Sequence, residues 1–168
     1  MVKKSVNYEK AWYVLAVARV MLGFVFLWAF LDKTLGLGFA TQHGKAWLDG
    51  VSPTTGFLKF GVNEKSPLFD FFQSLAGNPL VDWLFMLGLL GIGLALMLGI
   101  GLRVAAVAGT TLLMMMWAAE VPLENNPLVD DHMVYSVMLW VFAFAPRKWS
   151  FIDQWLQNSY AKKNPWVW

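Results

Sequence analysis

The side chains best suited to acid–base chemistry gather around one short connection in the chain. Glu120 ends a long apolar run, and Asp131 and His132 stand just before the next one. A carboxylic acid and an imidazole near a membrane surface can pass protons to and from a reactant such as a quinone. We expect Glu120, His132 and Asp131 to be catalytic residues, although charges also commonly mark the ends of membrane helices. These residue types can bind metals too, but the chain lacks the Glu-x-x-His pairs of di-iron bundles, so we expect no metal.

A second candidate, Arg19, lies inside another apolar run, residues 11–31. Placing an arginine at the centre of a membrane helix costs about 2.5–3.5 kcal/mol on insertion scales, so it needs a partner or a function. One interpretation is structural, with Arg19 reaching the membrane surface or pairing with an acid, chiefly Glu120. The other is that Arg19 contributes to a buried site for an anion or a quinone carbonyl.

Aromatic and charged residues at the ends of the apolar runs complete the predicted substrate or quinone site. At 100° per residue, Lys33 falls close to the helical face of Arg19, and Asp32 precedes it. Together with Arg19, the residues that we expect to bind substrate or quinone are Lys33, Asp32, Trp28, Trp117 and Tyr135.

Composition excludes several function classes. The chain has 168 residues, of which 58% are hydrophobic and only 14% charged, against about 25% charged residues in a soluble domain. It has no cysteine, which excludes disulfides, iron–sulfur clusters and thiol nucleophiles, and its two histidines are too few for a haem site. We find no nucleotide motif, hydrolase triad or nucleic-acid patch. We therefore expect no metal, haem or nucleotide cofactor and no nucleic-acid partner.

Four apolar runs predict an all-α integral membrane protein, a four-helix antiparallel bundle that forms a single domain over residues 1–168 and has the lipid bilayer as its partner. The expected membrane helices cover about residues 11–32, 82–102, 103–120 and 131–146. The external loop, residues 33–81, is aromatic, and we expect short interfacial helices in it. Ser66-Pro67 is a helix start signal there, and Gly77 is a stop signal.

Charges in the flanks predict the orientation. Lysine and arginine are concentrated on the side of the two termini, whereas the acids are concentrated on the other side. The positive-inside rule therefore predicts that both termini are cytoplasmic, including the tail at residues 147–168. We expect no cleaved signal peptide, because the first apolar run is too long, contains Arg19 and lacks a small-residue cleavage site.

One short repeat is present. Residues 78–82 and 126–130 are both Asn-Pro-Leu-Val-Asp, and each precedes an apolar run. Asparagine can cap a helix, proline suits the first helical position, and aspartate suits the first turn. The repeat predicts two similar helix starts, which reflect either a shared capping signal or an ancestral duplication of a helical hairpin.

Three segments resemble the DoxX/DoxD-like family of small four-helix membrane proteins of bacteria and archaea. They are Ala-Arg-Val-Met-Leu-Gly-Phe at 18–24 with Asp32-Lys33, Gly-Ile-Gly-Leu-Arg-Val-Ala-Ala at 99–106, and Ala-Pro-Arg-Lys-Trp-Ser-Phe-Ile-Asp at 145–153. The long first loop is more similar to the DoxD-type branch, which includes a subunit of thiosulfate:quinone oxidoreductase. The resemblance implies a multi-pass protein of the cell membrane that carries out sulfur or thiol redox chemistry, with quinone as its cofactor.

These observations together predict the membrane subunit of a quinone-linked oxidoreductase that acts on thiosulfate or a related sulfur compound. In this interpretation Arg19 and Lys33 polarise carbonyls or hold an anion, while Glu120 and His132 handle protons. The chain has no motif for a bound redox centre, so electrons would pass directly to quinone or through a redox partner subunit, and a homo-oligomer is a further option. The alternatives are a non-catalytic membrane anchor or scaffold for a redox partner, and a small-molecule transporter.

Overall fold

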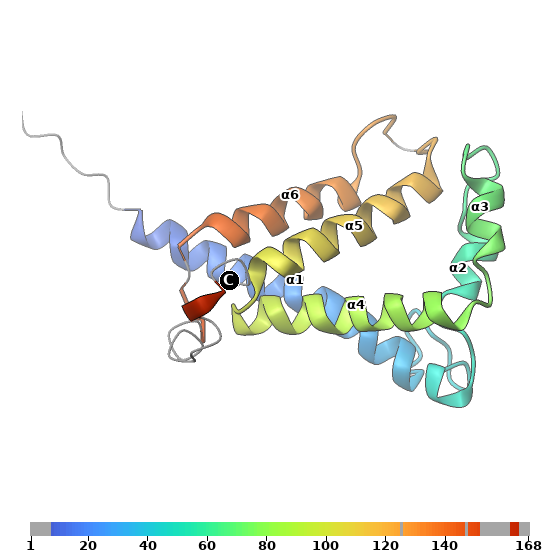
Figure 1. Ribbon diagram of the computed structural model, residues 1–168, viewed down its shortest axis with the longest axis horizontal. Coiled ribbons are helices and arrows are strands. Elements are labelled where there is room, and N and C mark those ends of the chain that lie inside the picture. The colour runs from blue at the N-terminus through green and yellow to red at the C-terminus, as the bar shows by residue number, and fades with distance from the viewer. Residues whose placement is uncertain (1–7, 125, 147, 152–161, 165–168) are drawn as a thin grey trace, which may run out of the picture.

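The computed structural model describes residues 8–124, 126–146, 148–151 and 162–164. Every element assigned among these residues is a helix, which confirms the all-α class (Figure 1). Three helices are long and apolar enough to cross a membrane. These are α1 (Glu9–Leu35), α4 (Pro79–Leu98) and α5 (Leu102–Glu120). The chain is therefore a membrane-embedded protein. The fourth apolar helix, α6 (Asp131–Phe144), has 14 residues, fewer than the roughly 20 that a straight span needs.

Two glycines, and not Arg103, determine where α4 ends and α5 begins. The break between α4 and α5 was expected beside Arg103, but α4 ends at Leu98 and α5 already begins at Leu102. Gly99 and Gly101 both adopt left-handed backbone angles, with φ of 71° and 66°. Only glycine enters this region without a steric penalty, so these two residues make the turn.

The four apolar helices form two antiparallel pairs, α1 with α4 and α5 with α6 (Figure 1). All four helices contribute to one apolar core, through residues such as Phe26, Met86, Leu113 and Leu139. Within the first pair the backbones come very close, since a Cβ added to Gly93 would lie 2.8 Å from the backbone nitrogen of Leu27. Small residues commonly permit this kind of helix contact in membranes.

The long loop folds over one end of the molecule. It contains a 3₁₀ turn, η1 (Trp47–Asp49), and two short helices, α2 (Thr55–Phe60) and α3 (Phe69–Ser74). Figure 1 shows α2 and α3 lying across the end where α4 begins and α5 finishes. The helix predicted after Ser66-Pro67 begins at Phe69.

Two polar residues of the loop donate hydrogen bonds to carbonyls at the end of α5 that have no partner within the helix. The backbone N–H of Asn63 donates to the Ala119 carbonyl at 2.9 Å, and the Ser66 hydroxyl donates to the Ala118 carbonyl at 3.0 Å. The last carbonyls of a helix have no partner within it, so such contacts complete the helix end. A second apolar cluster, with Leu58, Phe72 and Ala119 buried in it, packs beneath these bonds.

The two copies of Asn-Pro-Leu-Val-Asp have different outcomes. In the first copy the side chain of Asn78 caps α4, which begins at Pro79 as the repeat predicts. In the second copy the side chain of Asn126 makes the same bond to the N–H two residues on, yet α6 begins only at Asp131. The capping residue of α6 is instead Asp130, whose side chain accepts from the Met133 N–H.

Candidate functional site

Two of the predicted catalytic residues meet where α5 ends and α6 begins. The Nδ1 atom of His132 lies 2.7 Å from an oxygen of Asp130 and 4.0 Å from an oxygen of Glu120. The third predicted catalytic residue, Asp131, has an oxygen 3.8 Å from the same nitrogen, but its side chain is 70% exposed. The side chain of His132 is only 12% exposed. We call Glu120, Asp130 and His132 the carboxylate–histidine cluster.

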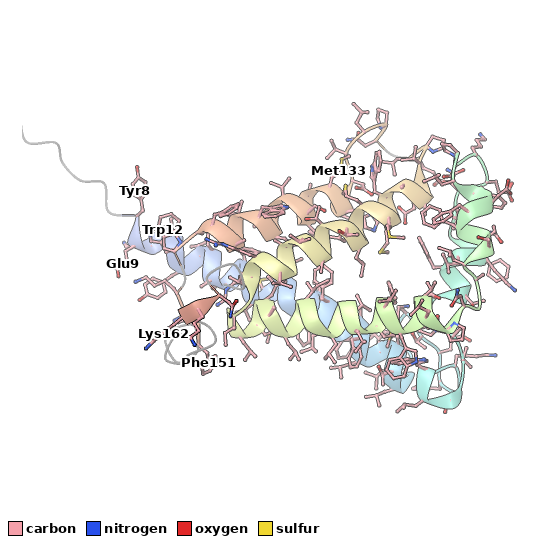
Figure 2. All side chains as sticks on the ribbon, in the orientation of Figure 1. Tyr8, Glu9, Trp12, Met133, Phe151 and Lys162 are labelled. Carbon is pink, nitrogen blue, oxygen red and sulfur yellow. The ribbon has the colours of Figure 1, made fainter. Side chains whose placement is uncertain are left out.

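The start of α6 explains why Asp130, and not Asp131, is the close partner. One oxygen of Asp130 accepts the Met133 N–H at 3.1 Å as a helix cap, and the other oxygen contacts His132 two residues further on. Met133 lies in the first turn of α6, beside the connection to α5 (Figure 2). Asp130 was not among the predicted site residues. Its position immediately before an apolar run that contains His132 was the signal that could have identified it.

The cluster borders a cleft between the α2–α3 turn and the α5–α6 connection. The cleft has a volume of about 990 Å³ and a strongly acidic lining. The charged side chains that line it are Glu64, Lys65, Glu120, Glu124, Asp130 and Asp131. Carboxylates that outnumber lysine attract cations and protons and repel anions. The cleft itself is therefore a poor binding place for the thiosulfate dianion.

Hydrogen bonding also changes the acidity of Asp130. Burial alone would raise its pKa, but the bond to His132 and the bond from the Met133 N–H hold the pKa of Asp130 below its ordinary value of 3.8. The carboxyl group is therefore ionised at neutral pH and acts as a hydrogen-bond acceptor.

The carboxylate–histidine cluster is the place where the described side chains could surround a metal ion, since one ligand atom from each residue lies within 4.8 Å of the others. The Nδ1 atom of His132 and the oxygen of Asp130 also lie at hydrogen-bond distance, 2.7 Å apart. This geometry suits a hydrogen-bonded acid–base pair.

Arg19 lies at the opposite end of the helices and binds backbone, not Glu120. It is 3% exposed, and its guanidinium donates to the carbonyls of Leu96, Lys148 and Trp149. The last two bonds measure 3.1 and 2.7 Å. Leu96 precedes the α4–α5 turn, so the 19-residue helix α5 separates this contact from Glu120, a distance of about 28 Å at 1.5 Å per residue. The expected pairing of Arg19 with Glu120 is wrong.

The residues expected to bind substrate near the end of α1 are engaged in local contacts. Both oxygens of the buried Asp32 accept backbone N–H groups, from Phe39 at 3.3 Å and from Thr41 at 2.7 Å. The ammonium group of Lys33 lies 6.0 Å from the centre of the Phe85 ring. The ring of Trp28 packs edge-on against Phe39 at 5.1 Å. The contacts of Asp32 and Trp28 order the chain as it leaves α1, and the Lys33 contact joins α1 to α4.

Trp117 and Tyr135 lie nearer to the cluster. Trp117 is one helical turn before Glu120 on α5, and Tyr135 is one turn after His132 on α6. Tyr135 packs against the main core. The indole N–H of Trp117 is buried and has no hydrogen-bond partner within the described part of the chain. A buried donor without an acceptor costs about 1–3 kcal/mol, so this group would gain from a ligand oxygen.

Comparison of the chain with protein-family models, with curated proteins and with solved structures found no match. The candidate site is therefore defined by its own geometry.

We predict that Asp130→Asn removes an acid-sensitive contribution to stability. Asparagine caps helices as well as aspartate does, so α6 should still form. Because the pKa of Asp130 is lower in the folded state, its contribution is fully present above its ordinary pKa of 3.8 and is lost as the pH falls further. Thermal unfolding in detergent between about pH 7 and pH 3 should show the wild type and the variant converging at the acid end. The exposed neighbour supplies the control: Asp131→Asn should show no such convergence, and equal behaviour of the two variants would contradict the assignment.

We predict that Arg19→Met destabilises the protein, because it leaves three backbone carbonyls without their donor. Hydrogen bonds to a charged group contribute about 1.5–3 kcal/mol, so the melting temperature in detergent should fall by several degrees. Arg19→Lys should recover only part of the loss, since an ammonium group lacks the planar fork of donors. Lys10→Met removes an exposed cation from the same helix and should have little effect. A variant Arg19→Met as stable as the wild type would show that the carbonyl contacts contribute nothing.

Proposed function

We propose that the protein is the membrane subunit of a quinone-linked oxidoreductase. The observation that carries the proposal is the position of the carboxylate–histidine cluster. The cluster lies at the end of apolar helices and borders an open, acidic cleft. At such a position a lipid-soluble quinone could exchange protons with water. The resemblance to the DoxX/DoxD-like family points to the same chemistry.

Trp117 supports a quinone as the lipid-soluble reactant. Its buried indole N–H needs an acceptor and lies one helical turn from Glu120. A quinone carbonyl is an acceptor on a flat apolar ring, and such a ring can enter between helices from the lipid. We propose that Trp117 donates to one quinone oxygen while the cluster exchanges protons with the reactant.

The acidic lining of the cleft affects where the sulfur compound could bind. Thiosulfate is a dianion, and the carboxylates of the cleft oppose its binding there. We therefore propose that thiosulfate, or a related sulfur compound, is oxidised on a redox partner subunit, which passes electrons to the quinone. This division also agrees with a chain that has no motif for a redox centre of its own.

The proposal includes a full four-helix antiparallel bundle in the membrane, with α6 as its short fourth member. The supporting observation is that Leu139 and Phe142 of α6 are buried in the same core as α1, α4 and α5. We place both termini in the cytoplasm and the cleft on the outer face of the cell membrane of a bacterium or archaeon, following the lysine and arginine distribution.

A second candidate function is a non-catalytic anchor for a soluble redox enzyme. It is favoured by the buried charges, because Arg19, Asp32 and Asp82 all have structural partners. Asp82 accepts from the hydroxyls of Ser52 and Thr54 at 2.8 and 2.5 Å. An anchor needs such contacts but has no use for the carboxylate–histidine cluster, so variants of the cluster separate the two functions.

We predict that Glu120→Gln and His132→Ala each lower thiosulfate-dependent quinone reduction, measured in membranes that contain the protein with its partners. Loss of a general acid or base lowers a rate by about 10²–10⁴-fold. If the two residues act as one unit, the double variant should be little slower than the slower single variant. Glu124→Gln, in the same cleft but not among the contacts of His132, serves as the control and should keep most of the activity. Full activity in both cluster variants would favour the anchor.

The orientation has a separate test, which uses the absence of natural cysteine. We predict that Glu124→Cys reacts with a membrane-impermeant thiol reagent added to intact cells. Lys163→Cys, in the C-terminal tail, should react only after the cells are opened, because the positive-inside rule places it in the cytoplasm. The reverse pattern of labelling would contradict the proposed orientation and would place the cleft on the cytoplasmic side.

A further inference from the structure

The structure assigns to Asp130 the role of a positioning residue that holds the proton of His132 on Nδ1 and leaves Nε2 as the nitrogen that exchanges protons with the reactant. The assignment of the tautomer stands on the hydrogen-bond geometry together with an ionised Asp130 carboxylate, whereas its consequence for turnover rests on the proposed function.

The first step concerns the direction of the hydrogen bond. An ionised carboxylate has no proton to donate, so at 2.7 Å the Nδ1 atom of His132 must be the donor and Asp130 the acceptor. In a neutral imidazole only one nitrogen carries a proton. A proton on Nδ1 therefore leaves Nε2 with a free lone pair.

The second step concerns how firmly Asp130 is held. Its second oxygen accepts the Met133 N–H at 3.1 Å, and its carbonyl accepts the Val134 N–H at 3.2 Å. The Ser136 hydroxyl also donates to the carbonyl of His132 at 2.8 Å. The carboxylate is thus fixed by the first turn of α6, and the backbone of His132 is bonded to Ser136 in the same helix. The same carboxylate of Asp130 therefore caps α6 and accepts the hydrogen bond from His132.

The third step asks which other charges act on the imidazole. Glu120 from α5 and Asp131 from α6 lie 4.0 and 3.8 Å from Nδ1, beyond hydrogen-bond distance. They add negative charge on the same side of the ring as Asp130, and the side chains of Glu64, Lys65 and Glu124 line the cleft further out. All three carboxylates near the ring therefore face Nδ1, and none of these contacts involves Nε2.

The proton step then balances as follows. When a reduced quinone oxygen needs a proton, the bond between Nε2 and hydrogen breaks in the imidazolium, and an O–H bond forms on the quinone. The electron pair of the broken bond stays on Nε2, and Nδ1–H remains bonded to Asp130, which is never protonated itself. The imidazole then takes a proton back on Nε2 from a hydronium ion of the surrounding solvent, which is left as water. The step moves one proton and no electrons.

The test uses the small number of histidines. The chain has two, and His43 is exposed in the loop, so His43→Gln leaves His132 as the only imidazole. Nitrogen NMR on this variant, labelled with ¹⁵N-histidine and held at alkaline pH, should give the Nδ1–H tautomer. Adding Asp130→Asn should change the signal to the Nε2–H tautomer, because the asparagine oxygen caps α6 and its amide N–H₂ then faces Nδ1.

Asp131→Asn is the matched control, since it removes the same charge from the neighbouring residue without touching a hydrogen bond to the ring. It should leave the tautomer unchanged, whereas Asp130→Asn should change the tautomer, lower the rate of quinone reduction by about ten-fold or more and shift the pH profile of that rate. Asp130→Ser, which keeps a capping oxygen but has too short a side chain to reach the ring, gives a second variant if Asp130→Asn folds poorly.

An Nε2–H signal in the variant that carries only His43→Gln would overturn the inference, as would an unchanged signal after Asp130→Asn. The expected NMR result combined with no quinone reduction in any form of the protein would leave the tautomer assignment standing and would count against the proposed function alone.

Discussion

The carbonyl groups at the ends of the apolar helices are the constraint that shapes this structure. The last turn of a helix leaves carbonyls without partners, and in an apolar environment each one costs free energy until a donor reaches it. At the end of α4 the donor is Arg19, which joins Leu96 to the carbonyls of residues 148 and 149. At the end of α5 the donors are Asn63 and Ser66 of the long loop.

The two helix ends also have different roles, since one is structural and the other carries the candidate acid–base site. The buried cation of Arg19 completes one end of the molecule through its bonds to the backbone carbonyls of Leu96, Lys148 and Trp149. At the other end the neutral donors of the loop take the carbonyls, so the carboxylate of Glu120 is left to face His132. The backbone N–H of Asn63 and the hydroxyl of Ser66 thus complete the end of α5 without adding a charge there.

Much of the helical architecture could be predicted from the sequence, because apolar runs of this length have few other structures open to them. Glu120 and His132 could also be brought together, since a short connection joins their helices. The partners of Arg19 could not, because backbone carbonyls have no sequence signal and two of them follow α6, more than a hundred residues away. The turn at Gly99 and Gly101 was not predicted, because the break was expected at the charge of Arg103. The helices instead end where the two glycines adopt left-handed backbone angles.

The role of Asp130 depends on where α6 begins. The pentapeptide that starts α4 places Asp82 within the first turn, where it binds the loop through Ser52 and Thr54. In the second copy the helix begins later, so the equivalent Asp130 becomes the cap and has an oxygen free for His132. Had α6 begun at Pro127, the carboxylate of Asp130 would have lain on the helix side, like that of Asp82, and His132 would have lost its partner. The delayed start of α6 is therefore what converts a repeated folding signal into an acid–base pair.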